Sequence, residues 1–243
     1  MVSKNQIKLI TSLQHKKFRI EHQLFIAEGV KVIQELLQSN FVLEHLFVTE
    51  PIFEKVATSK MTLIKEQEMQ KITALHSPSS CLAIFNIPTE FKIENKGLIV
   101  ALDAIRDPGN LGTIIRLCDW FGVKQIVCSE ATVDVYNPKV IQATMGSIAR
   151  VNVNYVDLNE YLEMTSLPVY GTFMDGATIY KEVLPEEGIL VFGNEANGIS
   201  SEIEMKIKNS IAIPRFGDSQ KTESLNVATA AAIILSEFRR NTL

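Results

Sequence analysis

The chain of 243 residues carries a formal net charge of −4, with 46% hydrophobic and 21% charged residues. This composition excludes a wholly disordered chain, and the length fits two domains of roughly 100–150 residues each. No apolar run approaches the ~18–20 residues of a membrane-spanning helix, and no hydrophobic block marks a secretory signal. We therefore expect a cytoplasmic protein with no membrane partner. The negative charge also argues against nucleic-acid binding through bulk positive charge.

Alternating helix and strand patterns predict an α/β fold for the first 90 residues. Apolar residues at helical spacing predict a helix around residues 7–13, and the motif LFIA at 24–27 predicts the first strand. Pro51 stands where a further helix is expected to begin. The other elements expected here are strands at 43–48, 61–64 and 81–87 and helices at 30–37 and 66–75.

A cluster of cations precedes the first strand, namely Lys4, Lys8, Lys16, Lys17 and Arg19. Only Glu21 opposes them, and His15 and His22 lie alongside. Two interpretations are open: a surface that contacts RNA phosphates, and a solvated helix face. On charge alone the solvated face is favoured.

The three cysteines, Cys81, Cys118 and Cys128, each fall inside an apolar run, and none forms a C-x-x-C pair. Neither a disulfide framework nor a zinc site is indicated, so buried free thiols are expected. No H-E-x-x-H or paired-histidine motif occurs, and no metal is expected. All four histidines lie in the N-terminal part, so a histidine general base in the second half is not expected.

The polar stretch at 86–97, which contains Pro88, is the expected linker between two domains. After it, LIVAL at 98–102 is typical of a parallel strand that is buried on both faces. A helix over 112–121 is expected to end at Gly122. The further strands expected are 124–129, 151–156, 168–173, 189–193 and 210–214.

Capping signals mark the helices of the second half. Asn137 as N-cap and Pro138 at the first helical position predict one helix. Ser201 and Glu204 predict a capping box for another. The further helices expected are 158–164 and 225–240.

Three loops follow buried strands and carry more polar residues than a connection needs, at 103–110, 193–198 and 214–226. Because the carboxyl ends of parallel strands share one edge of a sheet, these loops are expected to converge on a ligand site. Structural interpretations compete with this one. Asn110 is a candidate helix N-cap, and Arg116 a candidate ion-pair partner of Asp119 or Asp103.

The second and third loops leave the same choice open. Glu195 could hold an arginine or a ribose hydroxyl, whereas its surroundings also fit a turn of small polar residues. Ser224 or Thr222 could cap the last helix. Asn226 is unusual in the first turn of an apolar helix, because asparagine is a poor helix former there.

The usual nucleotide-binding fingerprints do not occur, since neither G-x-G-x-x-G nor G-x-x-x-x-G-K-[ST] is found. The residues alone therefore indicate a two-domain α/β protein with a polar site at the strand ends. At this site the sequence resembles the SpoU (TrmH-like) RNA ribose methyltransferases of the SPOUT superfamily. Three segments carry the resemblance, in the family's order and spacing: LDAIRDPGNLGTIIRLCDWFGV (102–123), ILVFGNEANGIS (189–200) and IAIPRFGDSQKTESLNVATAAAIILSEFRR (211–240).

The resemblance covers residues 97–243 and implies a parallel-sheet SPOUT domain with a deep trefoil knot. Residues 1–92 are similar to the smaller, L30e-like α/β domain that binds RNA substrates in this family. A homodimer is implied, with an active site that combines residues of both subunits. S-adenosyl-L-methionine is the implied cofactor, and its contacts map onto Gly193, Ile213, Leu225 and Thr172.

The family's catalytic positions map onto Arg116, Asn110, Glu195, Ser224 and Asn226. The implied reaction is methylation of a ribose 2′-hydroxyl in rRNA or tRNA, with rRNA favoured. Two roles for Arg116 are open. It holds a phosphate and stabilises the developing alkoxide, or it removes the proton in a desolvated site, although arginine is a poor base.

One departure from the family pattern lies in the third segment. The loop before Ser224 is about three residues longer than usual, and Arg215 stands where methionine is common. Two other functions were weighed against the methyltransferase: a non-catalytic RNA-binding protein that retains the knot, and an unrelated nucleotide-binding α/β enzyme. The set Asn110, Arg116, Glu195 and Asn226 disfavours the first, and the missing glycine-rich fingerprints disfavour the second.

Overall fold

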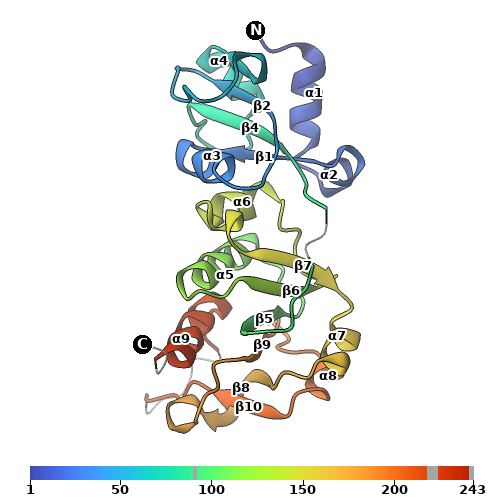
Figure 1. Ribbon diagram of the computed structural model, residues 1–243, viewed down its shortest axis with the longest axis vertical. Helices are drawn as coiled ribbons and strands as arrows, with labels where there is room; N and C mark the ends of the chain where they lie inside the picture. Colours follow the sequence, from blue (N-terminus) through green and yellow to red (C-terminus); the bar gives the residue numbers. More distant parts are fainter. Residues whose placement is uncertain (90–91, 218–223, 241–243) are drawn as a thin grey trace. The chain divides into compact units, whose positions relative to one another are not determined.

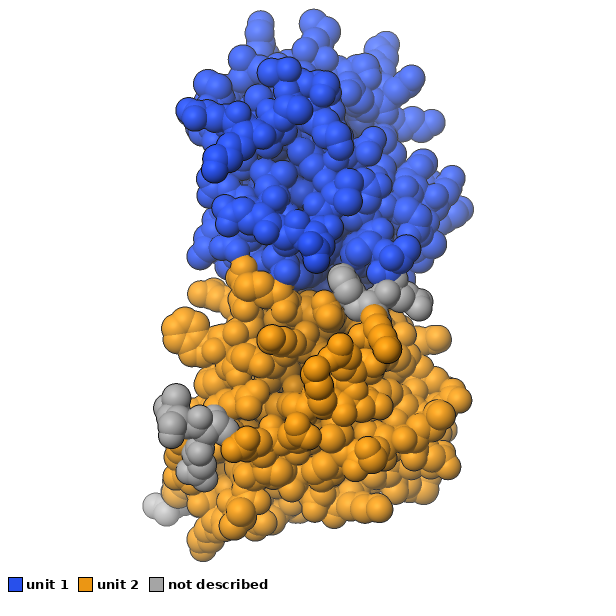
Figure 2. Space-filling view, in the orientation of Figure 1, with its two compact units in different colours: residues 1–89, 134–149 blue, residues 90–133, 150–243 orange. Residues whose placement is uncertain are grey.

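The computed structural model describes residues 1–89, 92–217 and 224–240. The chain divides into two compact units, shown in different colours in Figure 2. Unit 1 comprises residues 1–89 together with 134–149, and unit 2 comprises residues 90–133 and 150–243. Residues 134–149 thus belong to the same unit as the N-terminal part, although they lie between two strands of the unit 2 sheet in the sequence. The predicted Thr222 cap falls outside the described residues.

Unit 1 is built on a four-stranded sheet in the order β1-β4-β2-β3. Strand β4 is antiparallel to both β1 and β2, and β2 is parallel to β3. The strands are β1 Leu24–Glu28, β2 Leu43–Val48, β3 Met61–Leu63 and β4 Cys81–Asn86. The helices of residues 1–89 are α1 Lys4–Ser12, α2 Lys16–His22, α3 Val30–Leu37, η1 Thr58–Lys60 and α4 Glu66–Ile72. The expected alternation is confirmed, but the helix predicted at Pro51 is wrong, because helical structure begins only at Thr58.

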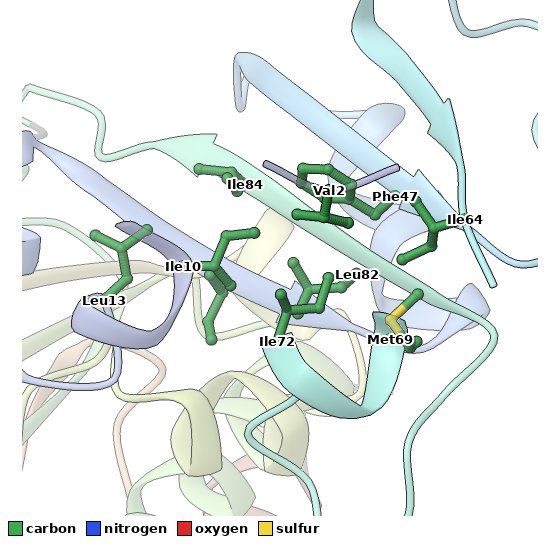
Figure 3. Close-up of a cluster of buried hydrophobic side chains, with 10 residues drawn as sticks. Val2, Ile10, Leu13, Phe47, Ile64, Met69, Ile72, Leu82 and Ile84 are labelled. Atoms are coloured by element: carbon green, nitrogen blue, oxygen red, sulfur yellow. The ribbon is translucent and has the colours of Figure 1, made fainter. Parts of the chain in front are cut away.

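Helices α1 and α4 pack together over the unit 1 sheet. Helix α1 begins at Ser3, whose hydroxyl and backbone form a reciprocal capping box with Gln6. Its apolar stripe meets α4 and the sheet in one buried cluster, seen in Figure 3. The cluster contains Val2, Ile10, Leu13, Ile26, Phe47, Ile64, Met69, Ile72, Leu82 and Ile84.

The segment 134–149 completes the core of unit 1. It carries α6 Pro138–Thr144, capped by the side chain of Asn137 as predicted, and η2 Ser147–Ala149. Helix α6 contacts β1, and the ring of Tyr136 lies 4.8 Å from that of Phe25, centroid to centroid.

Arg19 anchors the same segment. Its guanidinium donates to one carboxylate oxygen of Asp134 through Nε at 2.8 Å and through Nη2 at 2.5 Å. A third donor, Nη1, reaches the carbonyl of Leu13 at 2.8 Å. Arg19 is only 2% exposed, so its assignment to a phosphate-binding surface is wrong. The other four cations of that cluster are exposed and are called the basic face below: Lys4, Lys8, Lys16 and Lys17.

Unit 2 contains a six-stranded, all-parallel sheet in the order β10-β8-β9-β5-β6-β7 (Figure 1). The strands are β5 Leu98–Leu102, β6 Gln125–Ser129, β7 Asn152–Val156, β8 Val169–Thr178, β9 Gly188–Phe192 and β10 Asn209–Ala212. Every residue of β5 and β9 is buried, as expected for central strands covered on both faces. The α/β fold class is therefore confirmed, whereas the trefoil knot stays a prediction.

Helices cover both faces of this sheet. Helices α5 Pro108–Trp120 and α9 Val227–Arg239 pack against each other on one face, and α7 Leu158–Met164 and α8 Ser201–Glu204 lie on the other (Figure 1). The short η3 Ile179–Lys181 follows β8. The capping box predicted for α8 is wrong, because Ser200 is its N-cap residue and makes no side-chain cap hydrogen bond.

The topology explains where a site can form. From β5 the chain builds β6 and β7 on one side, whereas β9, β8 and β10 lie on the other side of β5. The loops that leave β5 and β9 therefore start side by side at the point where the order reverses. In open parallel sheets this is the position where ligands bind.

Candidate active site

The loop after β5 presents Asn110 to the site. Asp107 is the N-cap of α5, and its Oδ1 accepts a hydrogen bond from the backbone N–H of Asn110 at 2.8 Å. The competing interpretation of Asn110 as the N-cap is therefore wrong. Because Asp107 satisfies the helix end, the side chain of Asn110 is available for contacts with other loops.

Asn110 lies at the centre of a three-residue relay. Its Nδ2 donates to Oε1 of Glu195 at 2.7 Å, and its Oδ1 accepts from Nδ2 of Asn226 at 2.9 Å. An ionised carboxylate can only accept, so Asn110 must turn its NH2 group toward Glu195. Its oxygen then faces Asn226, which must in turn present its own NH2 group. The carboxylate thus fixes the orientation of both amides.

The last link of the relay also starts a helix. Asn226 is the N-cap of α9, and its Oδ1 accepts from the backbone N–H groups of Ala228 and Thr229 at 3.0 and 3.2 Å. The expectation that it lies inside the first helical turn is wrong, and so is the capping role considered for Ser224. At the N-cap position asparagine is among the most favoured residues.

The loop after β9 is a tight turn that carries Glu195 at its tip. Asn194 and Gly198 exchange two backbone hydrogen bonds, at 2.9 and 2.8 Å. Oδ1 of Asn194 accepts from the N–H groups of Ala196 and Asn197, while its Nδ2 donates to the carbonyl of Ala104 at 2.7 Å. The predicted turn of small polar residues is confirmed, and the same turn places Glu195 against Asn110.

A cavity of about 760 Å³ opens beside the relay. All four residues assigned to cofactor contacts line it: Thr172, Gly193, Ile213 and Leu225. Apolar side chains from β9, β10 and α9 form much of the wall, and Glu195, Asn197 and Ser224 add polar groups. This volume and this mixture are typical of small-molecule sites.

Gly193 is required by the packing of the cavity wall. A Cβ atom at this position would lie 2.2 Å from the backbone carbonyl carbon of Gly198 and 2.2 Å from the nitrogen of Ile199. Only glycine permits such a close approach of two backbone segments. Thr172 supports the neighbouring strand, since its hydroxyl donates to the carbonyl of Val191 at 3.1 Å.

Arg116 makes no hydrogen bond to the relay among the described residues. It is exposed on α5 and does not line the cavity. The ion pair considered for it does not form among the described residues, because Asp119 pairs with Arg150 at 2.8 Å and Asp103 accepts from the backbone of Ser200. Nothing described in its own chain therefore neutralises the guanidinium.

The thiols supply no alternative chemistry to this site. Cys81, Cys118 and Cys128 are buried free cysteines, as predicted. Burial raises the pKa of the Cys118 and Cys128 thiols far above the ordinary range, so both stay protonated. Among the described residues, no group of three or more His, Cys, Asp or Glu side chains could hold a metal ion. No helix in the described ranges is long and apolar enough to cross a membrane.

Three contributors to the site were not predicted from the sequence: Asp103, Asp107 and Asn194. Asp107 carried a usable signal, because an aspartate before a proline at the first helical position is a common helix start. Asp103 and Asn194 had no such sequence signal, because polar residues are common in surface loops.

Comparison with known proteins matches both parts of the chain to known families. Residues 97–236 match the SpoU rRNA Methylase family, and residues 4–83 match the MRM3-like substrate binding domain. The chain is 30% identical to the 23S rRNA (guanosine(2553)-2′-O)-methyltransferase RlmP of Bacillus subtilis (strain 168), over 98% of this chain and 97% of that protein.

Solved structures extend the likeness to the whole chain. A TrmH-family structure from Porphyromonas gingivalis is 37% identical, with a TM-score of 0.91 over 99% of each chain. An AdoMet-bound rRNA methyltransferase from Sinorhizobium meliloti is 28% identical, with a TM-score of 0.88 over 100% of this chain and 98% of that one. On the fold, the family match and the full-length relatives together, the chain belongs to the SpoU rRNA methylase family.

Proposed function

We propose that this protein is an S-adenosylmethionine-dependent methyltransferase that modifies a ribose 2′-hydroxyl in ribosomal RNA. The observation that carries the proposal is the relay Glu195–Asn110–Asn226 beside a cavity lined by Gly193 and Leu225. The names of the Bacillus subtilis and Sinorhizobium meliloti relatives support the ribosomal substrate.

The residues of the cavity fit S-adenosylmethionine. Apolar walls from Phe192, Ile199 and Ile234 suit an adenine ring, and Thr172 and Glu195 offer polar groups. Because this cofactor has no phosphate, a glycine-rich phosphate loop is not needed. When bound, S-adenosylmethionine supplies an electrophilic methyl group on a sulfonium sulfur.

The protein's part in the reaction is to place the ribose. The cofactor would supply the methyl carbon that the 2′-oxygen attacks, and this chain's residues would hold the ribose in line with it while the hydroxyl proton is lost to water. In-line positioning of such reactants contributes several kcal/mol to catalysis. Glu195 holds Asn110 in one orientation, and the relay then offers a fixed set of polar groups to the ribose.

Arg116 completes this site from a second copy of the chain in a homodimer. The support is its exposure on α5, its absence from the residues that line the cavity and its lack of an ion-pair partner among the described residues. A guanidinium in that place binds a phosphate and stabilises the charge that develops on the 2′-oxygen. This role is preferred to proton removal because arginine is a poor base.

The remaining parts of the proposal concern RNA capture and location. The basic face of α1 and α2 contacts phosphates of the RNA substrate, supported by the exposure of all four lysines and by the substrate-domain match over 4–83. The protein acts in the cytoplasm, where ribosomal RNA is the abundant substrate in bacteria. The proposed domains are 1–92 for RNA binding and 97–243 for methyl transfer, supported by the family matches over 4–83 and 97–236.

The test uses ribosomal RNA and, in a separate reaction, tRNA, both purified from a strain that lacks the gene. The wild-type protein is expected to transfer labelled methyl groups from S-adenosylmethionine to one nucleotide, and alkaline hydrolysis is expected to leave the adjacent bond uncut. Methylation of tRNA alone would overturn the ribosomal assignment. Cofactor binding without transfer to any RNA would establish a non-catalytic RNA-binding protein instead.

A further inference from the structure

We infer that Asp103 and Asn194 are positioning residues that fix Glu195 against Asn110, a role that rests on the proposed function. Neither side chain belongs to the relay itself. Together they tie the loop after β9 to two consecutive residues of the loop after β5.

The first tie joins Asp103 to the far end of the β9 loop. Asp103 directly follows β5 and is 6% exposed, and its Oδ2 accepts from the backbone N–H of Ser200 at 2.8 Å. Its own N–H donates to the carbonyl of Phe192, the last residue of β9, at 2.9 Å. A buried carboxylate is normally paired with a cation. Here the Asp103 carboxylate instead accepts from the backbone of the loop that carries Glu195.

The second tie runs through a backbone conformation that non-glycine residues rarely adopt. Ala104 has a φ of +55°. Its N–H donates to Oγ of Ser129 at 2.8 Å, and its carbonyl accepts from Nδ2 of Asn194 at 2.7 Å. The peptide groups on both sides of Ala104 are therefore held by side chains from the ends of β6 and β9. Such over-determined backbone positions cluster at active sites.

The two ties set the position of Glu195, whose carboxylate also accepts from Nδ2 of Asn194 at 3.5 Å. Glu195 is exposed, so packing does not hold it. Its predecessor Asn194 binds Ala104, and Ser200 at the end of the loop binds Asp103. Asn110 is placed by the loop after β5, because Asp107 of that loop caps α5 and accepts from the backbone N–H of Asn110. The 2.7 Å contact between Glu195 and Asn110 therefore depends on Asp103 and Asn194.

The test targets Asp103, because Asn194 also lines the cavity whereas Asp103 does not. Asp103→Ala is expected to lower kcat about 10–100-fold, since a displacement of ~1 Å at a reacting group costs about that much. The KM for S-adenosylmethionine is expected to change less than about 2-fold. Asp103→Asn keeps an acceptor oxygen for Ser200 and is expected to recover most of kcat.

A double-mutant cycle separates positioning from a general structural role. In a Glu195→Ala background, Asp103→Ala is expected to lower kcat by less than about 2-fold, because the group that it positions is gone. A full and additive loss in that background would overturn the inference. An equal loss of kcat and of cofactor affinity in the single variant would also overturn it.

A second readout is independent of activity and therefore distinguishes failure of the inference from failure of the proposed function. The side-chain NH2 signal of Asn110, observed by NMR in the full-length protein, is expected to be protected from hydrogen exchange in the wild type. Asp103→Ala and Glu195→Ala are both expected to remove that protection. Unchanged protection in Asp103→Ala would refute the positioning role. If Asp103→Ala does not fold, Asn194→Ala removes the second tie and is expected to give the same loss of protection, and unchanged protection there refutes the positioning role.

Discussion

Replacing Asn226 by alanine or by aspartate separates the stability of α9 from the relay. The alanine variant removes all three hydrogen bonds, namely the two that Oδ1 accepts from the helix and the one that Nδ2 donates to Asn110. The aspartate variant keeps an acceptor for Ala228 and Thr229 and loses only the donor. Its carboxylate then faces the oxygen of Asn110, and neither orientation of that amide satisfies both neighbours.

Loss of an N-cap costs about 1 kcal/mol. For a chain of this size, that lowers Tm by roughly 2–4 °C. Aspartate is as good a cap and is favoured by the helix dipole, so its Tm is expected within about 1–2 °C of the wild type. Both variants are expected to lose at least about 10-fold in kcat, because the relay no longer orients Asn110.

The assay pairs thermal unfolding followed by circular dichroism with methyl transfer to RNA from the deletion strain. Thr229→Ala at the start of the same helix is the matched control, since its side chain makes no relay contact, and it is expected to keep its activity. Full activity in Asn226→Asp would show that the relay is not needed for transfer. An aspartate variant as unstable as the alanine variant would show that the cap reasoning is wrong.

Four further outcomes follow from the contacts described. Arg116→Ala is expected to remove most turnover with nearly unchanged cofactor affinity by calorimetry, and equal loss of both would assign it a structural role. In Gly193→Ala the added Cβ would lie 2.2 Å from backbone atoms, so the variant is expected to lower the free energy of unfolding by about 1–3 kcal/mol and to weaken cofactor binding. A normal cofactor affinity in this variant would contradict the prediction. Charge reversal on the basic face is expected to weaken RNA binding and to reduce the dependence of that binding on salt concentration. An unchanged salt dependence would show that the basic face is only a solvated surface. Burial raises the pKa of Glu28, and this effect outweighs the hydrogen bonds from Thr73 and Ala74, which lower it. The folded state therefore binds the proton more tightly than the unfolded state. Stability is then expected to fall as pH rises from the ordinary carboxyl pKa through the raised one, and denaturant unfolding of Glu28→Gln is expected to lack that fall.

Local patterns were sufficient wherever an element is buried and bounded by turn residues. Strands at 43–48 and 98–102 and the helix at 158–164 have the predicted bounds. A buried strand reads as a short apolar run, and an amphipathic helix as a periodic one, independently of the rest of the chain. The location of the polar loops at the carboxyl ends of the strands could likewise be predicted, because each loop follows a buried strand in the sequence.

Helix starts and the relay could not be predicted from local sequence patterns. Which residue becomes the N-cap depends on where tertiary contacts bend the chain, so Asp107 and Asn226 were missed and Ser201 was wrongly assigned. The two relay hydrogen bonds join residues 85 and 116 positions apart. No local pattern encodes such pairings, and the family resemblance indicated the residues without their mutual contacts.

The contribution of residues 134–149 to unit 1 constrains the order in which this chain can fold during synthesis. Arg19 is buried against Asp134, and Phe25 packs on Tyr136, so the core of unit 1 stays incomplete until residue 149 has left the ribosome. By then β5 and β6 have already emerged. N-terminal domains usually fold first as the chain lengthens. Here a nascent chain that stops at residue 92 lacks both the Asp134 carboxylate that pairs with Arg19 and the Tyr136 ring that packs on Phe25.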